Sequence, residues 1–106
     1  MGILDNIDNE GFSDEVKNAI KRINANDKAL TSINLQYNKI GDNGAKFISE
    51  ALKNNNTLTS IGLSYNSIGV NGAKFISEAL KNNNTLTTLT LATTALAAKH
   101  GKRLML

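Results

Sequence analysis

The feature that most constrains this chain of 106 residues is an internal repeat with a period of 28 residues. Residues 30–57 read LTSINLQYNKIGDNGAKFISEALKNNNT, and residues 58–85 read LTSIGLSYNSIGVNGAKFISEALKNNNT. The copies are identical at 24 of 28 positions. They differ only at Asn34/Gly62, Gln36/Ser64, Lys39/Ser67 and Asp42/Val70. A third copy begins at Leu86 as LTTLTL and then loses the pattern. Such a repeat predicts a solenoid in which each copy packs on its neighbours.

Each copy carries the pattern of a strand, a turn and a helix. Leu30, Ile33 and Leu35 have the spacing L-x-x-L-x-L, which predicts a short strand with alternate side chains inward. A helix is expected over residues 43–53, with Asp42 as its N-cap. Its apolar residues recur on one face, which predicts that they pack under the strands. They are Phe47, Ile48, Ala51 and Leu52, and in the second copy Phe75, Ile76, Ala79 and Leu80.

Asparagine occurs at two kinds of position in the repeat. Asn38 and Asn66 follow the strands, where an amide can satisfy the backbone of a turn. We predict that these two residues are structural and form a ladder between adjacent turns. The run of asparagines at 54–56 ends the helix, because asparagine tolerates the left-handed conformation of a C-cap. We expect this run to be exposed.

The strings LTSINLQYNKIGDNGAKFISEAL and LTSIGLSYNSIGVNGAKFISEAL resemble the leucine-rich repeats of the ribonuclease-inhibitor type. The resemblance covers residues 30–91. It implies an α/β fold: a short, curved, right-handed array with a parallel sheet on the concave face and helices on the convex face. We therefore expect one domain in four parts. These are an N-terminal capping half-repeat (1–29), repeat 1 (30–57), repeat 2 (58–85) and a partial, degenerate repeat (86–106).

The two ends of the chain depart from the repeat. DEVKNAIKRINAN at 14–26 predicts a capping helix with Ser13 as its N-cap. After residue 92, TTALAAKHGKRLML replaces the expected YNxIGxNGAKFISEAL. Two outcomes are open for this end. Either it leaves the last strand uncovered, or residues 95–106 fold back as an improvised helix with Leu96, Leu104 and Met105 inward.

The composition gives little support to catalysis, metals or nucleic acid. The chain has no cysteine and a single histidine, His100. No pattern of other residues suggests a catalytic partner for this histidine. We therefore predict no catalytic, metal-binding or cofactor-binding residues and no cofactor. The net charge of +3 comes from Lys99, Lys102 and Arg103, since residues 1–98 hold nine basic and nine acidic residues. A basic end of this size is typical of a solvated terminus, so we expect no nucleic-acid partner.

The outward positions of the strands are the candidate binding surface. In the family that the chain resembles, this concave face is a frequent binding surface. The residues are small, neutral and polar, with two tyrosines at the rim, and tyrosine is favoured at interaction hot spots. The tyrosines either pack on each other or take part in recognition. The candidate concave face comprises Ser32, Asn34, Gln36, Tyr37, Ser60, Gly62, Ser64, Tyr65, Thr88 and Thr90.

The sequence favours a non-catalytic protein–protein interaction module whose protein partner it cannot name. The alternative is a structural or self-assembling fragment of a longer repeat array with no external partner. A last strand with an open edge would expose backbone and apolar side chains, which predicts a possible homodimer through the C-terminal end. The candidate self-association residues are Leu86, Leu89, Leu91, Leu96 and Leu104. No signal peptide or membrane span is recognisable, so we expect a cytoplasmic protein and no membrane partner.

Overall fold

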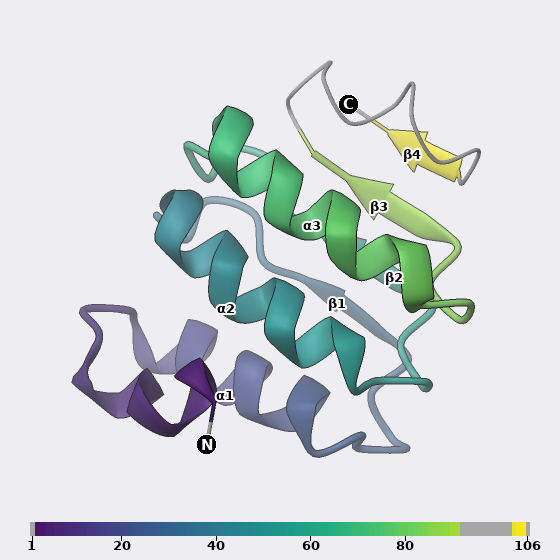
Figure 1. The fold of residues 1–106 in the computed structure, drawn as a ribbon, viewed down its shortest axis with the longest axis horizontal. Helices are drawn as coiled ribbons and strands as arrows, with labels where there is room; N and C mark the ends of the chain where they lie inside the picture. Colours follow the sequence, from purple (N-terminus) through teal and green to yellow (C-terminus); the bar gives the residue numbers. More distant parts are fainter. Residues whose placement is uncertain (1, 92–102, 106) are drawn as a thin grey trace.

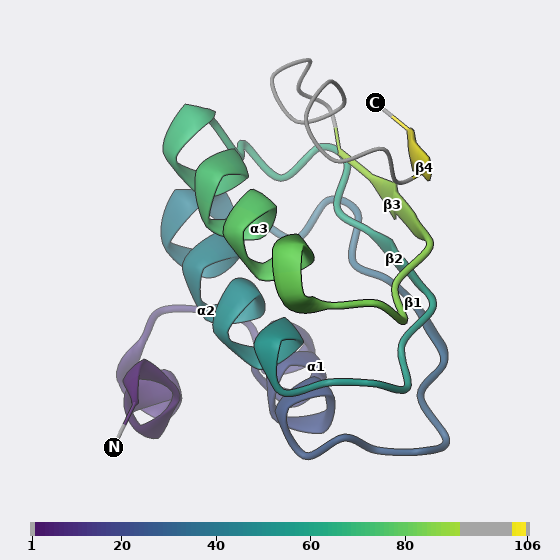
Figure 2. The ribbon, with the colours of Figure 1, turned by 45° about the vertical axis from the view of Figure 1, so that its right-hand side comes forward.

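The computed structural model describes residues 2–91 and 103–105, and it folds as two layers (Figure 1). Parallel strands form one layer and helices form the other (Figure 2). The elements in chain order are the 3-10 helix η1 (Ile3–Asn9), α1 (Asp14–Asn24), β1 (Ser32–Asn34), α2 (Gly41–Lys53), β2 (Ser60–Gly62), α3 (Val70–Asn82), β3 (Thr88–Thr90) and β4 (Arg103–Met105).

The period of the repeat sets the register of the sheet. The strands have the order β1-β2-β3-β4, and every described pairing is parallel. Across the first three strands, each residue lies beside the residue 28 positions further on, for example Ile33 beside Ile61. Parallel pairing needs a crossover between the strands, and α2 and α3 supply it. The expected strand–loop–helix array is therefore confirmed.

The core lies between the two layers and consists mainly of leucine, isoleucine and alanine. Leu35, Leu63 and Phe47 are buried, as predicted. Phe75 occupies the same repeat position as Phe47 but is 37% exposed, against 4% for Phe47, so its predicted burial was wrong. The reason lies in the neighbours. The Phe12 ring meets Phe47 edge-on with centroids 5.5 Å apart, whereas Phe75 has the ammonium of Lys46 at 6.0 Å from its ring centroid.

The N-terminal half-repeat closes one end of the helical layer. Its helix α1 begins at the expected cap, with the Ser13 hydroxyl accepting from the N–H of Val16 at 3.3 Å. Lys21 hydrogen-bonds Asp8 at 2.8 Å and lowers the pKa of that carboxyl. The hydrogen bond from Arg22 to Asp27, at 2.7 Å, lowers the pKa of Asp27 in the same way. Exposed ion pairs of this kind contribute little to stability, so apolar packing holds the half-repeat.

Asp42 has a different role from the one expected. Helix α2 begins at Gly41, not at residue 43, and its N-cap is Ile40. The Asp42 carboxylate instead accepts a hydrogen bond of 2.6 Å from the N–H of Gly69, the N-cap of α3. A carboxylate at a helix N-terminus is stabilising, because it meets the positive end of the helix dipole. Asp42 therefore couples the first repeat to the helix of the second.

The C-terminal end also differs from expectation. The outer edge of β3 is not open, because β4 of the same chain pairs with it. Leu86, Leu89 and Leu91 are buried under the sheet, so the apolar surface expected for self-association is absent from these three residues. Residues 103–105 form a strand, not the last turn of an improvised helix. Leu96 and His100 lie outside the described residues.

The middle asparagine of each run at the helix ends is buried, which corrects the expectation that these runs are exposed. Nδ2 of Asn83 donates to the carbonyl oxygens of Leu52 and Asn55, at 3.0 and 3.1 Å. Its Oδ1 accepts from the backbone N–H groups two and three residues on, at 2.9 and 2.8 Å. Asn55 likewise donates to the carbonyl of Ile23 at 3.0 Å. These amides join each turn to the one before it.

We expect the two phenylalanines to differ in their contribution to stability. Phe47→Ala should lower the free energy of unfolding by about 3–5 kcal/mol, because it empties a closed part of the core. Phe75→Ala should cost only about 1–2 kcal/mol, because part of its ring is already in water. Denaturant titration of both variants measures the difference. Equal losses would contradict the environments described for the two rings.

The buried asparagines give a second comparison within one run. Asn83→Ala should lower the free energy of unfolding by about 1–3 kcal/mol, because it leaves backbone groups of two turns without partners. Its exposed neighbour Asn82 is the control, and Asn82→Ala should change stability by less than about 0.5 kcal/mol. Thermal and denaturant unfolding of both variants test this prediction. Similar losses at the two positions would rule out the ladder.

Candidate functional site

The outward side chains of β1, β2 and β3 lie together on one uncharged surface. Because β1, β2 and β3 pair in register, residues 32, 60 and 88 form one row across the sheet and residues 34, 62 and 90 a second. Gln36 and Ser64 follow the strands at the carboxyl edge. The outward residues are exposed on β1 and half-buried on β2 and β3. The row members are Ser32, Ser60 and Thr88, then Asn34, Gly62 and Thr90.

Gly62 keeps the centre of this surface flat. A Cβ at this position would lie 3.0 Å from Oδ1 of Asn34 and 3.2 Å from Oγ1 of Thr90. Both distances are tighter than ordinary van der Waals contacts, so the flanking side chains occupy the space that a larger residue would need. A larger residue at position 62 would therefore require the side chains of Asn34 and Thr90 to shift by a few tenths of an ångström.

Tyr37 and Tyr65 stand at the carboxyl edge of the sheet and form the most exposed aromatic feature of the described residues. Their rings stack with centroids 4.7 Å apart and planes 1° apart. Stacking does not bury them, because Tyr37 is 70% exposed and Tyr65 is 64% exposed. Of the two alternatives left open by the sequence, mutual packing is therefore confirmed, and it leaves a surface of two parallel rings in contact with solvent.

The loops that carry the tyrosines are held in an unusual backbone conformation. Tyr37 and Tyr65 have φ angles of 58° and 60°, and Lys39 and Ser67 have 54° and 56°. Non-glycine residues occupy this left-handed region at a cost of order 1 kcal/mol or more each, so the surrounding structure must impose it. The same conformation in both copies places the two rings in parallel.

Asn66 supplies this constraint. It is buried, and its Nδ2 donates to the carbonyl oxygens of Leu35 and Leu63 at 2.8 and 3.0 Å. Its Oδ1 accepts from the N–H of Asn38 at 2.6 Å. Asn38 itself is half-buried, and its own amide donates only to the carbonyl of Gln36 at 3.1 Å. The two asparagines thus differ, because the capping half-repeat provides no preceding loop for Asn38 to bond.

We expect Asn66 and Asn38 to differ on substitution. Asn66→Ala should lower the free energy of unfolding by about 1–3 kcal/mol, because the buried backbone groups of two turns lose their partner. Asn38→Ala, the matched control, should cost less than about 1 kcal/mol. The ring signals of Tyr37 and Tyr65 in NMR spectra should move in the Asn66 variant. Unchanged tyrosine signals would show that Asn66 does not hold these loops.

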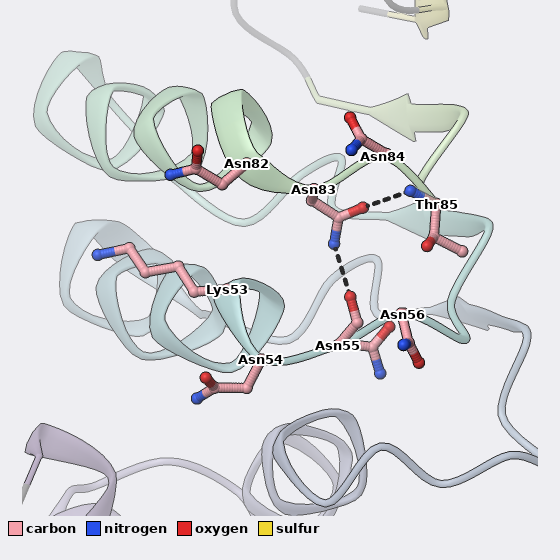
Figure 3. A pocket seen from close by; sticks show the side chains of 8 residues that line it. All are labelled: Lys53, Asn54, Asn55, Asn56, Asn82, Asn83, Asn84 and Thr85. Carbon is pink, nitrogen blue, oxygen red and sulfur yellow. Dashed lines mark hydrogen bonds between the residues drawn. The ribbon is translucent and has the colours of Figure 1, made fainter.

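A second feature is a polar hollow at the amino ends of the strands, opposite to the tyrosines, where α2 and α3 end (Figure 3). Its volume is about 290 Å³. We name it the asparagine hollow, and its lining consists of Lys53, Asn54, Asn55, Asn56, Asn82, Asn83, Asn84 and Thr85. Sequence reasoning missed this feature, because it treated the asparagine runs only as helix ends. The sequence did contain a signal for it, because the run of three asparagines recurs after 28 residues and is followed both times by threonine and leucine.

The described residues contain no arrangement that suggests catalysis. No group of three or more His, Asp or Glu side chains in this part of the chain could hold a metal ion. The outward positions of β1, β2 and β3 carry no ionisable group apart from the tyrosine hydroxyls at their carboxyl edge, and Arg103 of β4 lies in register beside Thr88. Among the helices that the structure describes, none is long and apolar enough to cross a membrane.

Strand–helix units of 28 residues that share one parallel sheet and one helical layer define a repeat solenoid. A family model for the leucine-rich repeat matches residues 28–49 and 54–77. The two repeats of this chain therefore match the leucine-rich repeat, and the strand–helix array that they form has the fold expected for it. No curated protein matches the sequence.

Two solved structures share this fold. One is the C-terminal domain of tropomodulin from Caenorhabditis elegans, with a TM-score of 0.64 and 22% identity over 73% of this chain and 46% of that chain. The other is leiomodin-1 actin-binding site 2, with a TM-score of 0.53 and 26% identity over 74% of this chain and 62% of that chain. This chain thus spans less than two thirds of the length of each of these structures, 46% of one and 62% of the other.

Proposed function

We propose that this leucine-rich-repeat protein is a non-catalytic protein-binding module whose partner docks on the strand surface and on Tyr37 and Tyr65. The observation that carries the proposal is the stacked tyrosine pair, which stays largely exposed although its loops hold a strained backbone. Tyrosine combines a large apolar ring with a hydroxyl, and it is enriched at interaction hot spots. Rings fixed by the fold also lose little entropy on binding.

The strand surface defines the chemistry of this partner. On β1, β2 and β3 its hydroxyl and amide side chains offer donors and acceptors without charge, and Arg103 of β4 lies beside Thr88 at one edge. The partner therefore presents a mainly neutral polar face with an apolar or planar group for the tyrosines. Leiomodin-1 actin-binding site 2 shares the fold. Actin is for this reason the first partner to test, and the class of function does not depend on that identity.

Four finer predictions remain part of this proposal. The repeats are of the ribonuclease-inhibitor type, which the period of 28 residues and the α-helix in each repeat support. The domain consists of a cap at 1–29, repeats at 30–57 and 58–85 and a degenerate repeat at 86–106. The protein is not an enzyme. The cytoplasmic location predicted from the sequence stays a prediction.

Paired tyrosine substitutions test the proposal. Tyr37→Ser with Tyr65→Ser should weaken partner binding about 30-fold or more, which corresponds to the loss of a hot spot of about 2 kcal/mol. Serine fits this backbone, because Ser67 already adopts a φ of 56° in the same loop. The measurements are affinity for purified actin and quantitative pull-down from a lysate.

Lys39→Ser is the matched control, since it lies in the same loop at a φ of 54° and should leave binding unchanged. A partner captured equally well by the wild type and the double tyrosine variant would contradict the proposed surface. So would equal weakening by the Lys39 variant. Circular dichroism of all three proteins establishes that each is folded.

The structural or self-assembling alternative stays open for a chain of this length, since about three repeats are normally needed for a stable solenoid. It predicts assembly without an external partner, with a homodimer as the simplest form. Sedimentation equilibrium at tens of micromolar separates the two functions. A monomer of 11.4 kDa supports the binding module, and a dimer or larger assembly supports the alternative.

A further inference from the structure

We propose that the asparagine hollow is a binding site for the side-chain carboxamides of a peptide that carries asparagine or glutamine. The site lies at the helix ends, on the side of the repeats opposite to the tyrosines, and it does not depend on the proposed function. Its first support is a comparison between two equivalent places in the molecule, one closed and one open.

The closed place lies between the capping half-repeat and the first asparagine run. Nδ2 of Asn54 donates to Oδ1 of Asn24 at 3.1 Å. Asn56 and Asn26 pair twice: the Asn56 N–H donates to Oδ1 of Asn26 at 2.8 Å, and Nδ2 of Asn26 donates to Oδ1 of Asn56 at 2.7 Å. The carboxamides of Asn24 and Asn26 therefore provide hydrogen-bond partners for Asn54 and Asn56, the first and last asparagines of this run, which we call its outer asparagines.

The open place lies one repeat further on. Asn82 and Asn84 are the outer asparagines of the second run and are exposed, and within the described residues their side chains have no hydrogen-bond partner. Asn54 cannot serve them, because its amide points toward α1 and away from Asn82 (Figure 3). The hollow of about 290 Å³ occupies this place. Its size corresponds to a pair of small side chains rather than a large cofactor.

The charge of the hollow selects a neutral ligand. Lys53 is the one charged residue of its lining, and its ammonium pairs with Glu50 at 3.1 Å. The C-terminal ends of α2 and α3 meet here, so the local helix dipoles oppose anions and favour hydrogen-bond donors. A primary carboxamide offers two donors and an acceptor without charge, and it is the group that fills the equivalent closed place.

The test uses a peptide that copies the natural closure, acetyl-Asn-Ala-Asn-amide. We expect saturable changes in the NMR signals of the Asn82 and Asn84 side-chain amides and of the Lys53 and Thr85 backbone amides. The midpoint should lie near about 1–10 mM, because so small a contact area supports only weak binding. The Asn82→Ala/Asn84→Ala variant should weaken the changes at Lys53 and Thr85 at least fivefold.

Asn71→Ala is the matched control, since Asn71 is an exposed asparagine at the other end of α3, and it should leave the titration unchanged. Acetyl-Asp-Ala-Asp-amide, which lacks the donors, should give no saturable change. The proposal is overturned by changes that spread over the surface, or that persist in the double variant. It is also overturned if glucose produces the same changes, or if they grow with protein concentration alone.

Discussion

Hydrogen bonds from buried asparagine amides to the backbone of the preceding turn are the interaction on which the rest of this structure depends. Each turn of a solenoid has backbone N–H and C=O groups at its corners that the strand and helix do not pair. Burying these groups without hydrogen-bond partners would lower the stability of the fold. Asn66 satisfies them at the end of the strand, and Asn55 and Asn83 satisfy them at the end of the helix. With both corners fixed, the leucines and isoleucines between them have one register in which to pack.

The sequence predicts the parts of the fold that repeat and fails where a residue depends on its neighbours in space. The 28-residue period gives the parallel register, and the L-x-x-L-x-L spacing gives the strands and the buried face. It could not distinguish Phe47 from Phe75, because the difference lies in Phe12 of the half-repeat. It also assigned Asp42 as the N-cap of its own helix. The Asp42 carboxylate instead accepts a hydrogen bond from the N–H of Gly69 in the next repeat, which the sequence does not show.

The candidate site shows the same division. The strand residues share one surface because alternation along a strand is a local property, and that was predictable. The sequence offered packing of Tyr37 on Tyr65 as one of two alternatives. Their exposure and parallel geometry follow from left-handed loops that Asn66 holds, which no local pattern identifies. The asparagine hollow is less predictable still, because the sequence does not show that Asn54 pairs with Asn24 of the half-repeat and not with the second run of asparagines.

Near-identical repeats thus acquire different roles from their place in the array. Each repeat carries the same groups for pairing with the turn before it, but the turn before the first is the capping half-repeat and the turn before the second is another repeat. Asn54 and Asn56 are therefore satisfied within the fold, whereas Asn82 and Asn84 retain hydrogen-bonding capacity at the surface. The N-terminal half-repeat therefore determines that the first run of asparagines, and not the second, is satisfied within the fold.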